Sequence, residues 1–118
     1  MSVPLYQRKA EFFRTLGHPV RIRVLELLGD GPKAVRDLLA DVEVEASSLS
    51  QQLAVLRRAG IVTTYREGAA VMYALAGPDV ADVMRAARRF LTEMIASQAH
   101  LLEALRDADD EDAVAAGR

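Results

Sequence analysis

Hydrophobic residues recur at intervals of three and four in four successive segments of the first half of the chain. Such spacing places apolar side chains on one face of a helix. Glycine and proline punctuate the pattern, as in Gly17-His18-Pro19 and in Gly29-Asp30-Gly31-Pro32, and Gly60 follows the fourth segment as a helix-ending residue. The pattern therefore predicts four helices, at about residues 4–16, Pro19–Leu28, Val35–Val42 and 45–59.

The pattern then changes from a helical to an alternating one. Residues 61–66 are rich in β-branched side chains, Glu67-Gly68-Ala69 supplies a turn, and apolar residues alternate from Val71 to Leu75. A β-hairpin is expected over about residues 61–75. Tyr65 and Tyr73 alternate with apolar residues, so partial packing of both rings into the core is favoured over a role for their hydroxyls in binding.

A last helix is predicted to begin at Gly77-Pro78-Asp79 and to continue to Leu105. It would span about 27 residues, or roughly 40 Å at 1.5 Å per residue. So small a domain cannot cover a helix of this length. Its apolar stripe is therefore expected to meet a second copy of the same chain.

The amino-acid composition limits the classes of protein to which this chain can belong. The chain has 118 residues, of which 51% are hydrophobic and 27% charged, which is typical of one globular domain. No apolar run approaches the roughly 18 residues of a membrane span, and no signal peptide is recognised, so a cytoplasmic protein without a membrane partner is expected. The absence of cysteine excludes disulfides, thiolate metal ligands and thiol redox switches.

Charge is unevenly distributed along the chain. The net charge is −2, but residues 107–118 hold five acidic residues and one basic residue, whereas residues 1–106 hold 14 basic and 12 acidic residues. Two parts are therefore predicted: a folded domain over residues 1–106 and an acidic, disordered tail over residues 107–118. The weak positive balance of the first part permits nucleic-acid binding without arguing for it.

The third and fourth predicted helices have the arrangement of a helix-turn-helix, in which the second helix reads DNA. That helix is rich in short hydroxyls and amides, which can bind phosphates and base edges, and an amide can bind adenine with two hydrogen bonds. Arg66, at the hairpin tip, could reach a phosphate or the minor groove. The candidate DNA-binding residues are Ser47, Ser48, Ser50, Gln51, Gln52, Arg57 and Arg66. The alternative is that they are ordinary surface residues.

Three ordered segments resemble the ArsR/SmtB family of transcription regulators. Phe13–Leu25 is similar to the junction of the family's first two helices, Ser47–Val62 to its recognition helix and following strand, and Arg66–Leu75 to its wing. The resemblance implies a mainly α fold with a small β-hairpin (α+β), a winged helix-turn-helix of four helices, a hairpin and a fifth helix. It also implies a homodimer formed through the first and last helices.

On this resemblance the dimer binds a palindromic double-stranded DNA operator. The recognition helix, about residues 45–59, would lie in the major groove, and the wing, about residues 61–75, would contact the DNA backbone or the minor groove. Repression is the expected sign of regulation, and activation is also compatible with the sequence.

The chain departs from the family at its metal sites, so neither a metal nor a cofactor is expected. Ala34 and Arg36 stand where the family's cysteines are found. At the last-helix site the matching residues are Gly77, Asp79, Phe90 and Glu93, which supply two carboxylates and no imidazole. The inducing signal stays open: a non-thiol ligand, a signal-bearing partner protein, or none.

Neither histidine is favoured as a metal ligand. His18 lies in the break between two helices, where a capping or packing role is favoured. His100 precedes Glu103 by one helical turn, and such pairs could form a weak nickel or zinc site across a dimer, although a solvated histidine is favoured.

Two other classes of function compete with DNA binding. The long last helix could serve a protein-interaction module that keeps the fold without binding DNA. An enzyme is disfavoured, because the sequence has no glycine-rich phosphate loop, nucleophile elbow or metal triad.

Overall fold

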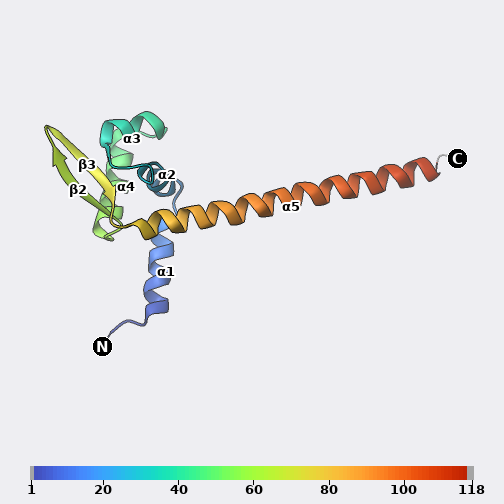
Figure 1. Ribbon diagram of the computed structural model, residues 1–118, viewed down its shortest axis with the longest axis horizontal. Coiled ribbons are helices and arrows are strands. Elements are labelled where there is room, and N and C mark those ends of the chain that lie inside the picture. The colour runs from blue at the N-terminus through green and yellow to red at the C-terminus, as the bar shows by residue number, and fades with distance from the viewer. Residues whose placement is uncertain (1, 117–118) are drawn as a thin grey trace. The chain divides into compact units, whose positions relative to one another are not determined.

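The computed structural model describes residues 2–116, and the predicted helices and hairpin are all present in it (Figure 1). The sheet contains one additional strand. In chain order the elements are α1 (Leu5–Leu16), α2 (Pro19–Leu28), β1 (Lys33–Ala34), α3 (Val35–Asp41), α4 (Ala46–Arg58), β2 (Val62–Glu67), β3 (Ala70–Leu75) and α5 (Pro78–Ala116).

The core is built mainly from leucines of α2, α3 and α4. Leu25, Leu38, Leu49 and Leu56 are completely inaccessible to solvent. Helices of 7 to 13 residues are marginal on their own, so their stability comes from the apolar face that each buries against the others. This packing fixes α3 and α4 as a helix-turn-helix pair.

The hairpin forms part of a three-stranded antiparallel sheet with the order β1-β3-β2. Val62 is 2% exposed, and Tyr73 packs against the same core. The strands are joined by Gly68-Ala69, and Gly68 has a φ of +63°, a conformation that glycine adopts without steric cost. The turn predicted at Glu67-Gly68-Ala69 is confirmed.

Strand β1 was not predicted. It consists of two residues, Lys33 and Ala34, which pair with Tyr73 and Met72 of β3. Two residues are too few to show an alternating pattern, and their extended conformation depends on a partner about forty residues away in the chain. Only the tertiary structure brings the two segments together.

The ends of the central helices confirm two local predictions. His18 caps the N-terminus of α2: its Nδ1 accepts a hydrogen bond from the backbone N–H of Val20 at 3.2 Å, and Pro19 occupies the first turn. Gly60, with a φ of +75°, ends α4. There the N–H of Ile61 bonds to the carbonyl of Leu56, and the N–H of Gly60 to that of Arg57, each at 3.0 Å.

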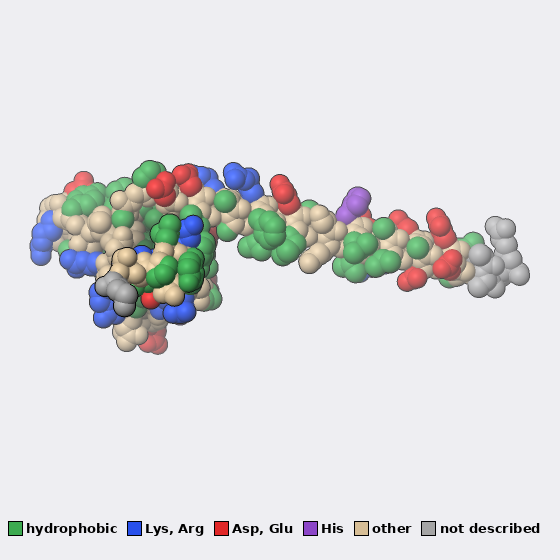
Figure 2. Space-filling view, turned by 90° about the horizontal axis from the view of Figure 1, so that it is seen from below, with side chains coloured by type: hydrophobic (Ala, Val, Ile, Leu, Met, Phe, Trp, Pro, Cys, Tyr) green, Lys and Arg blue, Asp and Glu red, His purple; other side chains and the backbone are tan. Residues whose placement is uncertain are grey.

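The chain divides into two compact units, one ending at Met84 and one beginning at Arg85. The first unit contains the core, onto which Val80, Val83 and Met84 from the start of α5 also pack. The second consists of the rest of α5, along which hydrophobic side chains are exposed (Figure 2).

Helix α5 has 39 residues, 12 more than the roughly 27 predicted. It continues through residues 107–116, for which a disordered tail was expected; residues 117 and 118 lie outside the described residues. No glycine or proline interrupts the sequence between Pro78 and Gly117, and alanine, the strongest helix former, is frequent near the end. The division of the chain at residue 106 stays a prediction. No described helix is both long and apolar enough to cross a membrane.

Candidate nucleic-acid interface

Helix α4 presents two distinct faces. Leu49, Leu53 and Leu56 are at most 1% exposed and anchor the helix to the core. The opposite face is polar and open to solvent. Anchoring by three leucines at intervals of four and three holds the helix rigidly while leaving this face free for a partner.

Three exposed polar side chains form a stripe along the outer face of α4. They are Ser47, Gln51 and Arg58. Gln51 follows Ser47 by four residues, and Arg58 follows Ser47 by eleven, or about three turns of an α-helix, so the three point in nearly the same direction. We call these residues the outer stripe.

The remaining candidates of α4 lie beside the outer stripe. Ser50 and Arg57 are exposed on one flank, and Ser48 is half-buried on the other. Arg58 therefore lies more centrally than Arg57, although Arg57 was the predicted candidate. The signal that identifies Arg58 is present in the sequence: its distance of eleven residues from Ser47 is close to a whole number of turns.

Gln52 is placed differently from the other candidates. It is half-buried, and its Oε1 accepts a hydrogen bond of 2.7 Å from Nε of Arg21 in α2. One end of the amide is thus used within the protein, and only the Nε2 group is left for another partner. A role for Gln52 in base reading stays a prediction, and its observed contact holds α4 to α2.

The hairpin follows α4 after Ala59-Gly60-Ile61, and Arg66 is exposed one pair from its turn, opposite Val71. Tyr65 is 45% exposed, so its predicted packing into the core is wrong, whereas that of Tyr73 is confirmed. The two tyrosines differ because adjacent residues of a strand point to opposite sides. Tyr65 follows Thr64, which pairs with Tyr73 and shares its side of the sheet.

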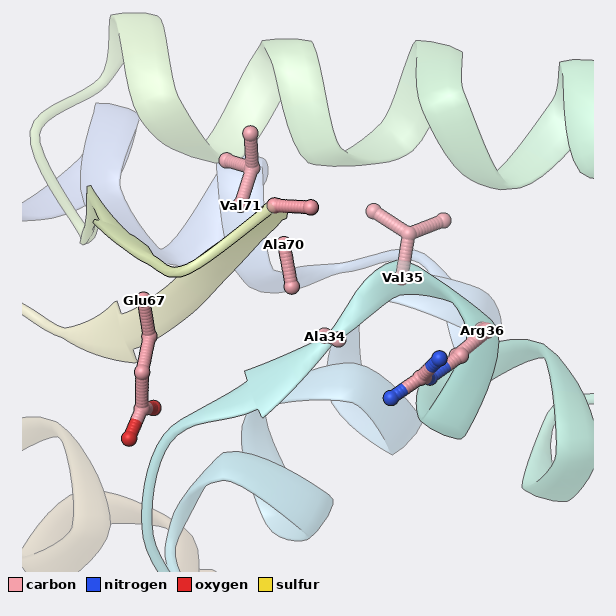
Figure 3. A pocket seen from close by; sticks show the side chains of 7 residues that line it. Ala34, Val35, Arg36, Glu67, Ala70 and Val71 are labelled. Carbon is pink, nitrogen blue, oxygen red and sulfur yellow. The ribbon is translucent and has the colours of Figure 1, made fainter.

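An open cavity of about 450 Å³ lies between the start of α3 and the tip of the hairpin (Figure 3). Ala34 and Arg36 line one side, and Glu67, Ala70 and Val71 line the other. Ala34 and Arg36 are the two residues that the sequence resemblance predicts in place of the family's cysteines. They supply a methyl group and a guanidinium, neither of which binds a soft metal ion.

No group of three or more histidine, aspartate or glutamate side chains within residues 2–116 is arranged to hold a metal ion. Asp79, Phe90, Glu93 and His100 are all exposed on α5. His100 and Glu103 are exposed on α5; a solvated His100 stays the prediction, and a weak metal site shared by two copies of the chain stays the open alternative.

Comparison with known proteins identifies the family. Residues 18–64 match the family model described as bacterial regulatory protein, arsR family. The HTH-type transcriptional regulator Rv0081 of Mycobacterium tuberculosis is 51% identical over 106 residues, which cover 89% of this chain and 93% of the relative. The chain belongs to the arsR family. This ArsR-family protein is a DNA-binding transcriptional regulator with a winged helix-turn-helix fold.

Further relatives and solved structures agree with this assignment. The biofilm growth-associated repressor of Agrobacterium fabrum is 40% identical to the ArsR-family protein over 90 residues, covering 73% of this chain and 77% of the relative. The crystal structure of Rv0081 matches with a TM-score of 0.74 over 82% of this chain and 98% of that one. The winged helix-turn-helix domain of Mb0332 from Mycobacterium bovis, described as homodimeric, is 27% identical to this chain. It matches with a TM-score of 0.70 over 77% of this chain and 84% of that one.

Proposed function

We propose that this regulator binds an inverted-repeat DNA operator as a homodimer and represses transcription, with α4 in the major groove and the hairpin on the adjacent backbone or minor groove. The observation that supports this most directly is the outer stripe of α4. Its polar groups are exposed on a helix whose other face is fixed to the core by three buried leucines.

The chemistry of the outer stripe suits base and phosphate contacts. The Gln51 amide can donate to N7 and accept from N6 of an adenine, if it approaches the base edge in the plane of the pair. The Ser47 hydroxyl, in the first turns, can bind a phosphate or a base edge. The Arg58 guanidinium can bind a phosphate with two hydrogen bonds. Ser48, Ser50 and Arg57 would contact the groove walls from the flanks.

The hairpin provides a second contact. Arg66 lies close to its turn and is exposed, and a long cationic side chain at such a tip can enter a narrow minor groove or bind a phosphate. The turn residues Gly68 and Ala69 are small, so the tip can approach the DNA backbone closely.

Two exposed apolar surfaces support dimerisation. In α1, Leu5, Tyr6 and Phe13 are 58% to 71% exposed, and in α5 the exposed fractions of Phe90 and Ile95 are 66% and 61%. Clusters of exposed large apolar side chains are typical of interaction sites. A two-fold dimer would present two copies of α4 about one DNA turn apart, roughly 34 Å, and would therefore read an inverted repeat.

Repression is the sign of regulation that the relatives favour. The relative from Agrobacterium fabrum is named a repressor, as is a Synechocystis relative that is 37% identical over 93 residues and named a transcriptional repressor SmtB homolog. A dimer that covers an operator can exclude RNA polymerase without any further activity. The protein would act in the cytoplasm, on the chromosome. A signal-bearing partner protein is one of the three alternatives for its regulation, beside a non-thiol ligand and no signal at all.

The test is fluorescence anisotropy of the purified full chain on the DNA upstream of its own gene, across a salt series. We expect tight binding to one inverted repeat that weakens steeply as salt increases, because lysine and arginine contacts with phosphates release counterions. The same titration is repeated with nickel, zinc and cobalt. We expect that none of the three metals changes the affinity for the operator. Equal affinity for every sequence, together with a stable complex with another protein, would instead favour an interaction module.

A further inference from the structure

Arg21 joins three helices of the winged-helix unit through one planar group. Its Nε donates to Oε1 of Gln52 in α4 at 2.7 Å, and its Nη1 donates to the backbone carbonyl of Thr15 in α1 at 3.0 Å. Arg21 itself belongs to α2, two residues after Pro19. Thr15, Arg21 and Gln52 are half-buried residues, and both hydrogen bonds are partly shielded from water.

The contact with Thr15 has a defined electrostatic role. Thr15 is the second-last residue of α1, and its carbonyl is one of the four that have no partner within that helix. A cation at this end of a helix also meets the negative end of the helix dipole. Arg21 therefore stabilises the C-terminal end of α1 and ties it to α2.

The contact with Gln52 fixes α4. Gln52 immediately follows Gln51 of the outer stripe, so a displacement of one moves the other on the same rigid helix. A hydrogen bond from a charged donor is roughly twice as strong as a neutral one, and the planar guanidinium gives it a fixed direction. The leucines of α4 determine which face of the helix is buried, and this bond adds a directional contact that constrains the rotation of α4 about its own axis further.

We propose that Arg21 is a positioning residue for operator recognition, which sets the orientation of α4 relative to the end of α1 and thereby determines which base pairs the outer stripe can read. The proposal rests on the proposed function, since it requires α4 to read DNA. It also gives Gln52 a role that differs from base reading. Its side chain acts inside the protein, as the hydrogen-bond acceptor that holds α4 in its orientation.

The experiment compares specific and non-specific DNA binding by variants of the full chain. The specific probe is a duplex enriched from a random library by the wild-type protein, and the non-specific probe is a shuffled duplex of the same length at the same salt. The variants are Arg21→Met, Gln52→Met and the double variant. Arg23→Met is the matched control, because Arg23 is an exposed arginine of the same helix and loses the same charge.

Arg21→Met is expected to weaken binding to the enriched duplex about tenfold more than Arg23→Met does. On the shuffled duplex, the two substitutions are expected to change the affinity equally. If Arg21 acts through Gln52, the double variant loses no more than the larger single loss, because the two residues form one unit. A general loss of folding would weaken both probes together, and urea denaturation corrects for the folded fraction. Arg21→Lys serves as a second variant if Arg21→Met does not fold: it keeps the charge without the planar, two-directional donor, and the same selective loss is expected.

Equal losses for Arg21→Met and Arg23→Met on the enriched duplex, or losses that multiply in the double variant, would overturn the role of Arg21 while leaving the proposed function intact. Failure of the wild-type chain to enrich any duplex would overturn both. The two failures are therefore distinguishable in a single series of titrations.

Discussion

The most direct test of the outer stripe is the substitution Gln51→Ala. Gln51 is exposed on α4, opposite the leucines that anchor the helix. An alanine at an exposed helical position preserves the helix, since alanine has the highest helix propensity. Its effect on the free energy of unfolding should therefore stay within about 0.5 kcal/mol, the usual range for such surface changes.

The effect on DNA recognition should be much larger. A well-placed amide that binds a base with two hydrogen bonds contributes about 1–3 kcal/mol of discrimination against the wrong base. Gln51→Ala should therefore reduce the preference for the enriched operator by roughly 5-fold to 150-fold, since each 1.4 kcal/mol corresponds to a factor of ten. Binding to shuffled DNA should be unchanged, because the substitution alters no charge.

The assay measures anisotropy on the enriched operator and on a set of operators that each carry one changed base pair. The preference should be lost at one position in each half-site and retained at the others. Gln7→Ala, which removes an exposed glutamine from α1, is the matched control. An unchanged pattern of base preference, with the folded fraction and the dimer content at wild-type values, would refute the assignment of α4 as the reading helix.

Three further predictions concern stability and assembly. Gly60→Ala should destabilise the fold by about 1–2 kcal/mol in urea denaturation, because Gly60 ends α4 with a φ of +75°, and a midpoint equal to that of the wild type would contradict this account. His18→Ala should cost about 1 kcal/mol by removing the cap of α2, whereas His18→Asn, which retains an acceptor, should lose less; equal losses would argue for packing instead. Phe13→Asp should weaken the dimer in sedimentation experiments with no change in helical content, because Phe13 is 58% exposed on α1; an unaltered dimer would exclude this surface from the interface.

The sequence by itself determined most of the local structure. The bounds of α2 were predicted to the residue because His18-Pro19 and Gly29 are start and stop signals that act through the backbone, independently of distant residues. The end of α4 and the turn of the hairpin were predictable for the same reason, since both depend on glycine at a positive φ. The resemblance of three segments, in the right order along the chain, was also sufficient to identify the correct family.

The length of α5 follows from the sequence, although the predicted end at Leu105 was too early. Acidic composition suggested a disordered tail after residue 106, yet the absence of any glycine or proline before Gly117 allows the helix to continue. An acidic composition shows that a segment is well solvated, but it does not show where a helix ends. A helix ends at a residue that it cannot accommodate, such as glycine or proline.

Only the tertiary structure decided what depends on distant contacts. Strand β1 exists because Lys33 and Ala34 meet β3, and the exposure of Tyr65 follows from the pairing that buries Tyr73. Gln51 and Gln52 are adjacent and chemically identical, so the sequence could not separate their roles. The packing of α4 on α2 turns one of them to solvent and the other to Arg21, 31 residues away, because successive side chains of a helix differ by about 100° in direction.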